Sequence, residues 1–102
     1  MTRYKFLTDE NGLCGFIIEG HSGYAESGSD IVCAAVSSAA YMVINTITEV
    51  LGVNADITES DARLGIKVKG NDTDKCRYLL SGLRLHLDAL RGQYPEHITS
   101  GE

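Results

Sequence analysis

The chain has 102 residues, of which 43% are hydrophobic and 23% charged, and its net charge is −5. This length predicts a single domain that buries one core without structural staples. The acidic balance disfavours nucleic-acid binding through a basic surface, and the apolar runs fall short of the length that crosses a bilayer. Three cysteines without close pairing, and a start without a signal-peptide pattern, favour the cytoplasm over a disulfide framework.

The first third of the chain predicts a β-hairpin. In residues 3–9 aromatic residues alternate with basic ones, which is the period of a half-buried strand. Asn11-Gly12 is a turn signal, because this pair tolerates positive φ. Residues 13–19 alternate again, so the two segments are expected to pair.

The remaining chain predicts two helices separated by a second strand pair. From Asp30 to about Leu51 the sequence has no glycine or proline and is apolar on nearly every side. Such a helix is a buried one, and in so small a domain part of it is expected to meet another subunit. Residues 54–60 and 62–69 predict strands, and residues 72–92 carry leucines at the spacing of one helical stripe.

The order β-β-α-β-β-α predicts an α+β fold: a two-layer sandwich with a mainly antiparallel sheet of about four strands and two helices on one face. Residues 1–98 are expected to form the domain and residues 99–102 a short polar tail. His97 is placed in a frayed, inert segment. Cys14 and Cys76 fall on apolar faces, which predicts packing.

Candidate chemistry is concentrated in residues 19–38, which read EGHSGYAESGSDIVCAAVSS. Ser29 or Asp30 is a natural N-cap, which places Cys33 about three residues into the helix. Its sulfur would lie near the positive end of the helix dipole. The dipole stabilises a thiolate there by only about 0.3–1 kcal/mol, which is too little to ionise a thiol. His21, at the end of the second strand, is the nearby group that could supply the second positive charge.

Each of these residues also has a plainer interpretation. Cys33 could be a core residue, His21 a loop residue with a backbone bond, and Gly20, Gly23 and Gly28 turn formers. A metal site is disfavoured, because neither a CxxC motif nor a second nearby histidine accompanies the pair. From the residues alone, the catalytic and the structural interpretations both stay open.

The stretch GHSGYAESGSDIVCAAVS, residues 20–37, resembles the signature of the Prp family, the ribosomal-processing cysteine proteases. The family pattern is Gly-His, a short loop with an aromatic residue and a glycine, then Asp-Ile-Val-Cys-Ala and a helix of small residues. Weaker similarity extends over most of residues 2–98. Ser22 stands where the family often has alanine, a minor departure.

The resemblance implies a bacterial, homodimeric cysteine endopeptidase. Its substrate would be large-subunit ribosomal protein number twenty-seven, whose short N-terminal extension is cut off after a hydrophobic stretch that ends in paired aromatics. Carried over by position, Cys33 would be the nucleophile and His21 its base. No cofactor or metal is expected, and no direct contact with nucleic acid or membrane.

Further residues are candidates for supporting roles. Asp30 could orient His21, and Ser37, one turn beyond Cys33, could bond within the site or be a structural hydroxyl. Backbone N–H groups at the helix start, including that of Cys33, could stabilise an oxyanion. The loop 22–29 suits a lid that orders over a peptide, which makes the following residues substrate-loop candidates: Gly20, Ser22, Gly23, Tyr24 and Gly28.

Two other function classes remain open at this stage. The chain could be a non-catalytic acidic adaptor that binds basic ribosomal-protein tails, with Cys33 buried. It could also be a redox sensor that uses the same sulfur, although no resolving cysteine is evident nearby. The rate of thiol labelling measured against pH separates the enzyme from the adaptor: the enzyme predicts selective alkylation of Cys33 that is lost in His21→Ala, and the adaptor predicts equal, slow labelling of all three cysteines.

Overall fold

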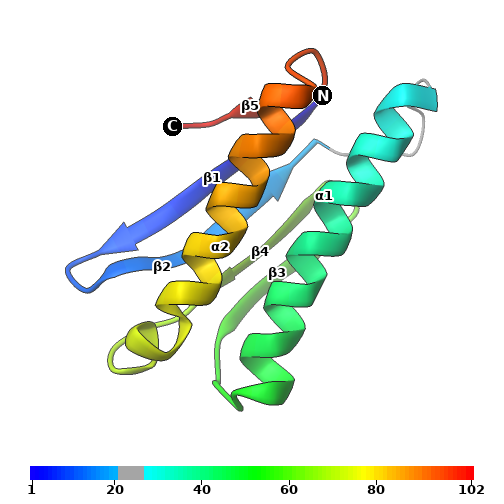
Figure 1. Cartoon of the computed structure of the whole chain (residues 1–102). Coiled ribbons are helices and arrows are strands. Elements are labelled where there is room, and N and C mark those ends of the chain that lie inside the picture. The colour runs from blue at the N-terminus through cyan, green and yellow to red at the C-terminus, as the bar shows by residue number, and fades with distance from the viewer. Residues whose placement is uncertain (21–26) are drawn as a thin grey trace.

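The computed structural model describes residues 1–20 and 27–102, and residues 27–30 by their backbone alone. Two helices cover one face of a five-stranded sheet (Figure 1). The elements in chain order are β1 (Thr2–Asp9), β2 (Gly12–Glu19), α1 (Ser27–Asn45), the π-helical turn η1 (Thr46–Val50), β3 (Asp56–Ser60), β4 (Arg63–Lys67), α2 (Asp72–Gln93) and β5 (Ile98–Ser100).

The strands lie in the order β3-β4-β2-β1-β5. The neighbours β1/β2, β2/β4 and β3/β4 are antiparallel, while β1 and β5 are parallel. The expected hairpin of β1 and β2 is present, and its register shifts between Leu7 and Thr8. The expected α+β class, with two helices on one face of a mainly antiparallel sheet, is confirmed.

The fifth strand was not expected from the sequence. Ile98–Ser100 pairs in parallel with Thr2–Tyr4, so residues 99 and 100 lie in the sheet rather than in a polar tail. The backbone of His97 is not frayed either, because its carbonyl oxygen accepts a hydrogen bond from the Thr2 N–H at 2.9 Å. A three-residue strand is too short to show a period of two, and its pairing edge is supplied by the opposite end of the chain.

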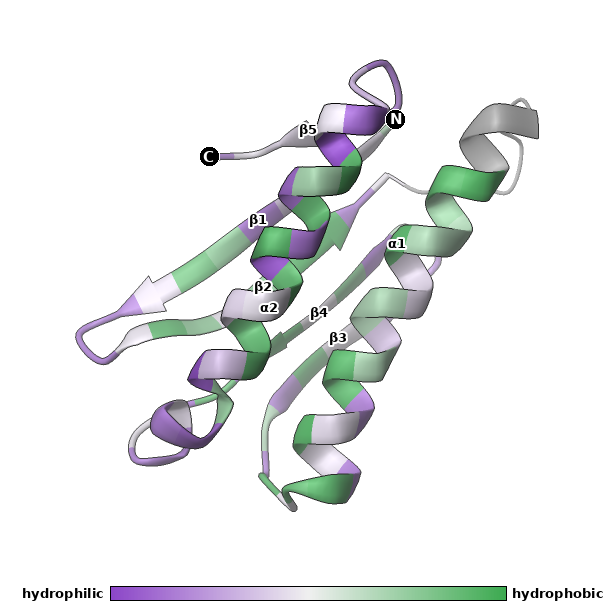
Figure 2. Ribbon diagram, in the orientation of Figure 1, coloured by the Kyte–Doolittle hydropathy of each residue, from purple (hydrophilic) through white to green (hydrophobic). Residues whose placement is uncertain are grey.

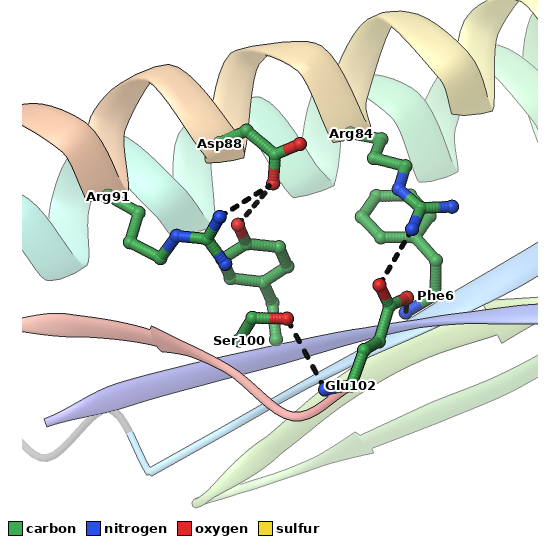
Figure 3. A network of polar contacts seen from close by, with 7 residues as sticks. Phe6, Arg84, Asp88, Arg91, Ser100 and Glu102 are labelled. Atoms are coloured by element: carbon green, nitrogen blue, oxygen red, sulfur yellow. Dashed lines mark hydrogen bonds and ion pairs between the residues drawn. The ribbon is translucent and has the colours of Figure 1, made fainter.

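The last residue is also held to the domain (Figure 3). The Glu102 carboxylate accepts a hydrogen bond from the Phe6 N–H at 3.0 Å and from the Arg84 guanidinium at 2.7 Å. Nearby, the buried Tyr4 hydroxyl donates a hydrogen bond to Asp88 on α2. These contacts connect β1, the C-terminus and α2 along one side of the molecule.

The core fills the space between the sheet and the helices. Alternate residues of β1, β2 and β4 point toward the helices, and each large apolar side chain buried there contributes about 1.5–3 kcal/mol. Cys14 and Cys76 are both fully buried, which confirms that they pack in the core. The largest fully buried side chains are Tyr4, Phe16, Ile18, Ile47, Ile66, Leu80, Leu87 and Ile98.

From residue 31 onward the helix α1 is mostly green in Figure 2, with white and pale purple patches between, so apolar residues predominate on it. Over Ile31–Val50 the mean hydropathy is 1.7, so by length and composition this helix could cross a membrane, contrary to the expectation from the sequence. A core helix of a soluble protein has the same composition, and one face of this helix packs on the sheet. The opposite face leaves Ile31 and Met42 exposed, and Val50 of η1 is exposed as well.

Candidate active site

The helix that carries Cys33 begins earlier than the sequence predicted. It starts at Ser27, so Ser29 and Asp30 lie inside its first turn and do not cap it. Cys33 follows the start by six residues, which is well beyond the first turn, where the helix dipole acts. Its N–H is also past the four free donors of the helix start, which removes it as an oxyanion donor.

The Cys33 side chain is half-buried, and its sulfur lies 3.3 Å from the hydroxyl oxygen of Thr2. Either atom of this pair can donate the hydrogen bond. Thr2 is the first residue of β1, so this contact connects the sheet to α1. Ser37, four residues after Cys33 on the same helix face, is half-buried too.

The other two cysteines differ from Cys33 in exposure. Burial raises the pKa of the Cys14 thiol, and the nearby Asp9 carboxylate adds to this increase. Burial raises the pKa of the Cys76 thiol as well, with Asp72 adding to it. Of the three cysteines, Cys33 is the one that is only half-buried, while Cys14 and Cys76 are buried.

Gly20 directly follows β2, which ends at Glu19, and precedes His21 in the sequence. Its φ is +85°, and a Cβ built on it would lie 2.6 Å from the Met1 carbonyl oxygen. Its N–H donates a hydrogen bond to the Ala62 carbonyl oxygen at 3.0 Å. Only glycine fits this conformation and this close approach, so the structure gives Gly20 a backbone role.

A shallow hollow with both polar and apolar lining residues lies at the same end of the sheet. It is lined by Met1, Arg3, Glu19, Gly20, Ala62, Arg63 and Thr99. The Arg63 guanidinium and the Glu19 carboxylate form an ion pair across it at 3.7 Å. Within residues 1–20 and 27–102, no group of three or more His, Cys, Asp or Glu side chains gathers as a metal site requires.

Several predicted site residues lie outside the described part of the chain. His21, Ser22, Gly23 and Tyr24 are among residues 21–26, so the predicted Cys33–His21 pair stays a prediction. Gly28 and Asp30 lie in the first turn of α1. Their roles as substrate-loop and orienting residues also stay predictions.

Sequence reasoning missed Thr2. The alternation of β1 was recognised over residues 3–9, and its extension by one residue places Thr2 on the same face as Tyr4 and Phe6. A polar residue at the end of an apolar row was a signal that could have singled it out. Its contact with Cys33 was not visible, because 31 residues separate the two in sequence.

The fold and the site define a small α+β protein with a single accessible thiol on its first long helix. Its structure resembles that of the ribosomal processing protease Prp from Staphylococcus aureus, solved with a substrate peptide, with a TM-score of 0.87 and 23% identity over 99% of this chain and 98% of the other. SMU.848 from Streptococcus mutans is similar as well, with a TM-score of 0.86 and 25% identity over 98% and 91% of the two chains.

The sequence relatives agree with the fold. The model of the family "Cysteine protease Prp" matches residues 1–99. A ribosomal processing cysteine protease Prp from S. aureus is 28% identical over 94 residues, which cover 90% of this chain and 89% of the relative. Its Bacillus subtilis counterpart is 23% identical over 95 residues, covering 87% and 85%. The chain thus belongs to the Prp family of ribosomal-processing cysteine proteases, as its signature indicated.

Proposed function

We propose that this chain is a cysteine endopeptidase that removes the N-terminal extension of large-subunit ribosomal protein number twenty-seven during ribosome assembly. The observation that carries the proposal is the partial exposure of Cys33, which occupies the cysteine position of the family signature, while Cys14 and Cys76 are buried. Membership of the Prp family over residues 1–99 supports it. The exposure also argues against the adaptor hypothesis, which required a buried Cys33.

The reaction follows from the chemistry of a thiol and an imidazole. His21 takes the proton of Cys33, and the thiolate attacks the scissile carbonyl carbon to form a tetrahedral intermediate. The C–N bond breaks as the imidazolium gives its proton to the leaving amine, and a thioester remains on Cys33. Water then attacks the thioester with His21 as base, which releases the new carboxylate and restores the thiol.

Other residues have supporting roles in this proposal. Asp30 precedes Cys33 by three residues in α1, and residues three apart share a helix face, which favours a role in orienting His21. Ser37 lies one turn further along and is accessible enough to bond within the site. The proposed substrate loop follows β2 in the sequence, and Gly20 at its start has a positive φ.

We further propose that the enzyme is a homodimer in the bacterial cytoplasm. The outer face of α1 and the following turn η1 exposes several large apolar side chains, including Ile31 and Met42 on α1 and Val50 on η1. A row of this kind on one helix is typical of a protein–protein interface. A second copy of the chain is the partner that the family resemblance implies.

The decisive experiment is cleavage of a peptide that contains the extension and its junction. We expect the wild-type chain to cut it once, and Cys33→Ala to abolish cleavage while the chain remains folded. Cys14→Ala is the matched control, because it makes the same change at a buried cysteine and should retain cleavage. Binding of the peptide by wild type and Cys33→Ala alike, with cleavage by neither, would contradict the proposal and favour an adaptor.

A further inference from the structure

Thr2 is a buried polar residue at the end of an apolar row. It shares the helix-facing side of β1 with Tyr4 and Phe6, and only 1% of its surface is exposed. A valine has nearly the same shape and would fill this volume without a polar group. What threonine adds is a hydroxyl, and the oxygen of that hydroxyl lies 3.3 Å from the Cys33 sulfur.

The position of this hydroxyl is fixed by the sheet. The Thr2 N–H donates a hydrogen bond to the His97 carbonyl oxygen at 2.9 Å, and Thr2 pairs in register with Ile98 of β5. A β-branched side chain is restricted at χ1, so a fixed backbone also fixes the direction of the hydroxyl. The sulfur therefore meets a polar group held by an element other than its own helix.

We propose that Thr2 is a positioning residue for Cys33: its hydroxyl donates a hydrogen bond to the thiolate and holds the sulfur in its attacking orientation. This inference rests on the proposed function, in which Cys33 is the nucleophile. A hydrogen bond to an ionised acceptor is about twice as strong as one between neutral groups, so the hydroxyl favours the thiolate over the thiol. This contribution matters because Cys33 lies beyond the first turn of α1.

Thr2→Val tests the proposal, since it removes the hydroxyl and keeps the shape. We expect kcat on the extension peptide to fall about tenfold with KM nearly unchanged. The rate at which iodoacetamide alkylates Cys33 should fall roughly threefold or more, the loss of thiolate being partly offset by higher intrinsic nucleophilicity. Thr2→Ser, which keeps the hydroxyl, should restore most of both rates.

Thr58→Val on β3 is the matched control. It makes the same substitution at a half-buried strand position, and in the sheet β4 and β2 lie between β3 and β1. It should leave both rates unchanged. A folded Thr2→Val with wild-type kcat and wild-type alkylation would overturn the proposal. If Thr2→Val does not fold, Thr2→Ser and Thr2→Ala are compared instead, and equal rates for these two variants would overturn it as well.

The alkylation assay separates this inference from the proposed function. If the wild-type chain leaves the extension peptide intact, the proposed function fails. Slower alkylation of Thr2→Val, with rescue by Thr2→Ser, would still support the contact between Thr2 and the sulfur. Unchanged alkylation would overturn the Thr2 proposal even if Cys33 proves to be the nucleophile.

Discussion

Gly20 and Ala62 are joined by a backbone hydrogen bond, 3.0 Å from the Gly20 nitrogen to the Ala62 oxygen. Ala62 lies in the turn between β3 and β4, so this bond attaches the last residue before the candidate loop to a second hairpin. On its other side, the Met1 carbonyl oxygen occupies the space that a Cβ of residue 20 would need. Gly20 therefore has a defined backbone position, although glycine is a conformationally flexible residue type.

We expect Gly20→Ala to impair both stability and catalysis. At a φ of +85° an alanine is strained by about 1–2 kcal/mol, and its Cβ would lie 2.6 Å from the Met1 carbonyl oxygen. The free energy of unfolding should therefore fall by about 2 kcal/mol or more. In the peptide assay kcat should fall as well, because the strained backbone adjoins His21, the proposed base.

Gly70→Ala is the matched control for this prediction. Gly70 also has a positive φ, +62°, but within residues 1–20 and 27–102 no atom of a non-adjacent residue lies within 4 Å of its ideal Cβ. This variant should lose only about 1 kcal/mol and keep wild-type kcat. Urea unfolding and the peptide assay measure the two effects, and equal losses in both variants would show that the contact with Met1 is unimportant.

The three thiols should differ sharply in reactivity. Under native conditions, we expect iodoacetamide to alkylate Cys33 and to leave Cys14 and Cys76 unmodified, because both are fully buried and burial raises the pKa of each. Peptide mass spectrometry after a short reaction identifies the modified cysteine. All three should react at similar rates in urea, which is the internal control. Equal native labelling of the three would contradict the assignment of Cys33 as the accessible thiol.

Stability should decline at high pH, partly through Tyr4. Burial, followed by its hydrogen bond to Asp88, raises the pKa of Tyr4 to about 12. In the unfolded chain the pKa is about 10, so the unfolded state loses the proton first as the pH rises. The stability contributed by protonated Tyr4 is thus fully present below pH about 10 and is lost as the pH rises through about 12.

Tyr4→Phe removes this titration, so its free energy of unfolding should fall less steeply between pH about 10 and 12. At neutral pH the variant should be less stable by roughly 1 kcal/mol, because Asp88 loses its donor. Tyr78→Phe is the control, since Tyr78 is 88% exposed. Urea titrations at several pH values make the comparison, and parallel slopes for wild type and Tyr4→Phe would refute the prediction.

The outer face of α1 should carry the dimer interface. Met42 is one of the exposed apolar residues of this helix, with 56% of its surface exposed. Met42→Asp places a charge at this position. We expect the dissociation constant of the dimer, measured by sedimentation equilibrium, to rise about tenfold or more. Leu85→Asp makes a similar change at a 74% exposed position of α2 and should have little effect. A monomeric wild-type chain would contradict the proposed homodimer.

The sequence was sufficient for the regular elements, because their signals are local. Alternation in residues 3–9 and the Asn11-Gly12 turn predicted the β1/β2 hairpin, and the leucine stripe predicted α2. The sequence predicts a start of α1 three residues later than the structure shows, because Ser29 and Asp30 are both favourable N-cap residues. β5 was missed because three residues carry no period.

The amino-acid sequence by itself determined the class of fold, the family, and the identity of the cysteine to test, since these depend on short-range patterns and on an ungapped signature. The tertiary structure decided which thiol is accessible, where the first helix begins, and that Thr2 contacts Cys33 across 31 positions of the chain. Contacts of that kind arise when the sheet and the helices pack together, because packing fixes distances that no local pattern encodes.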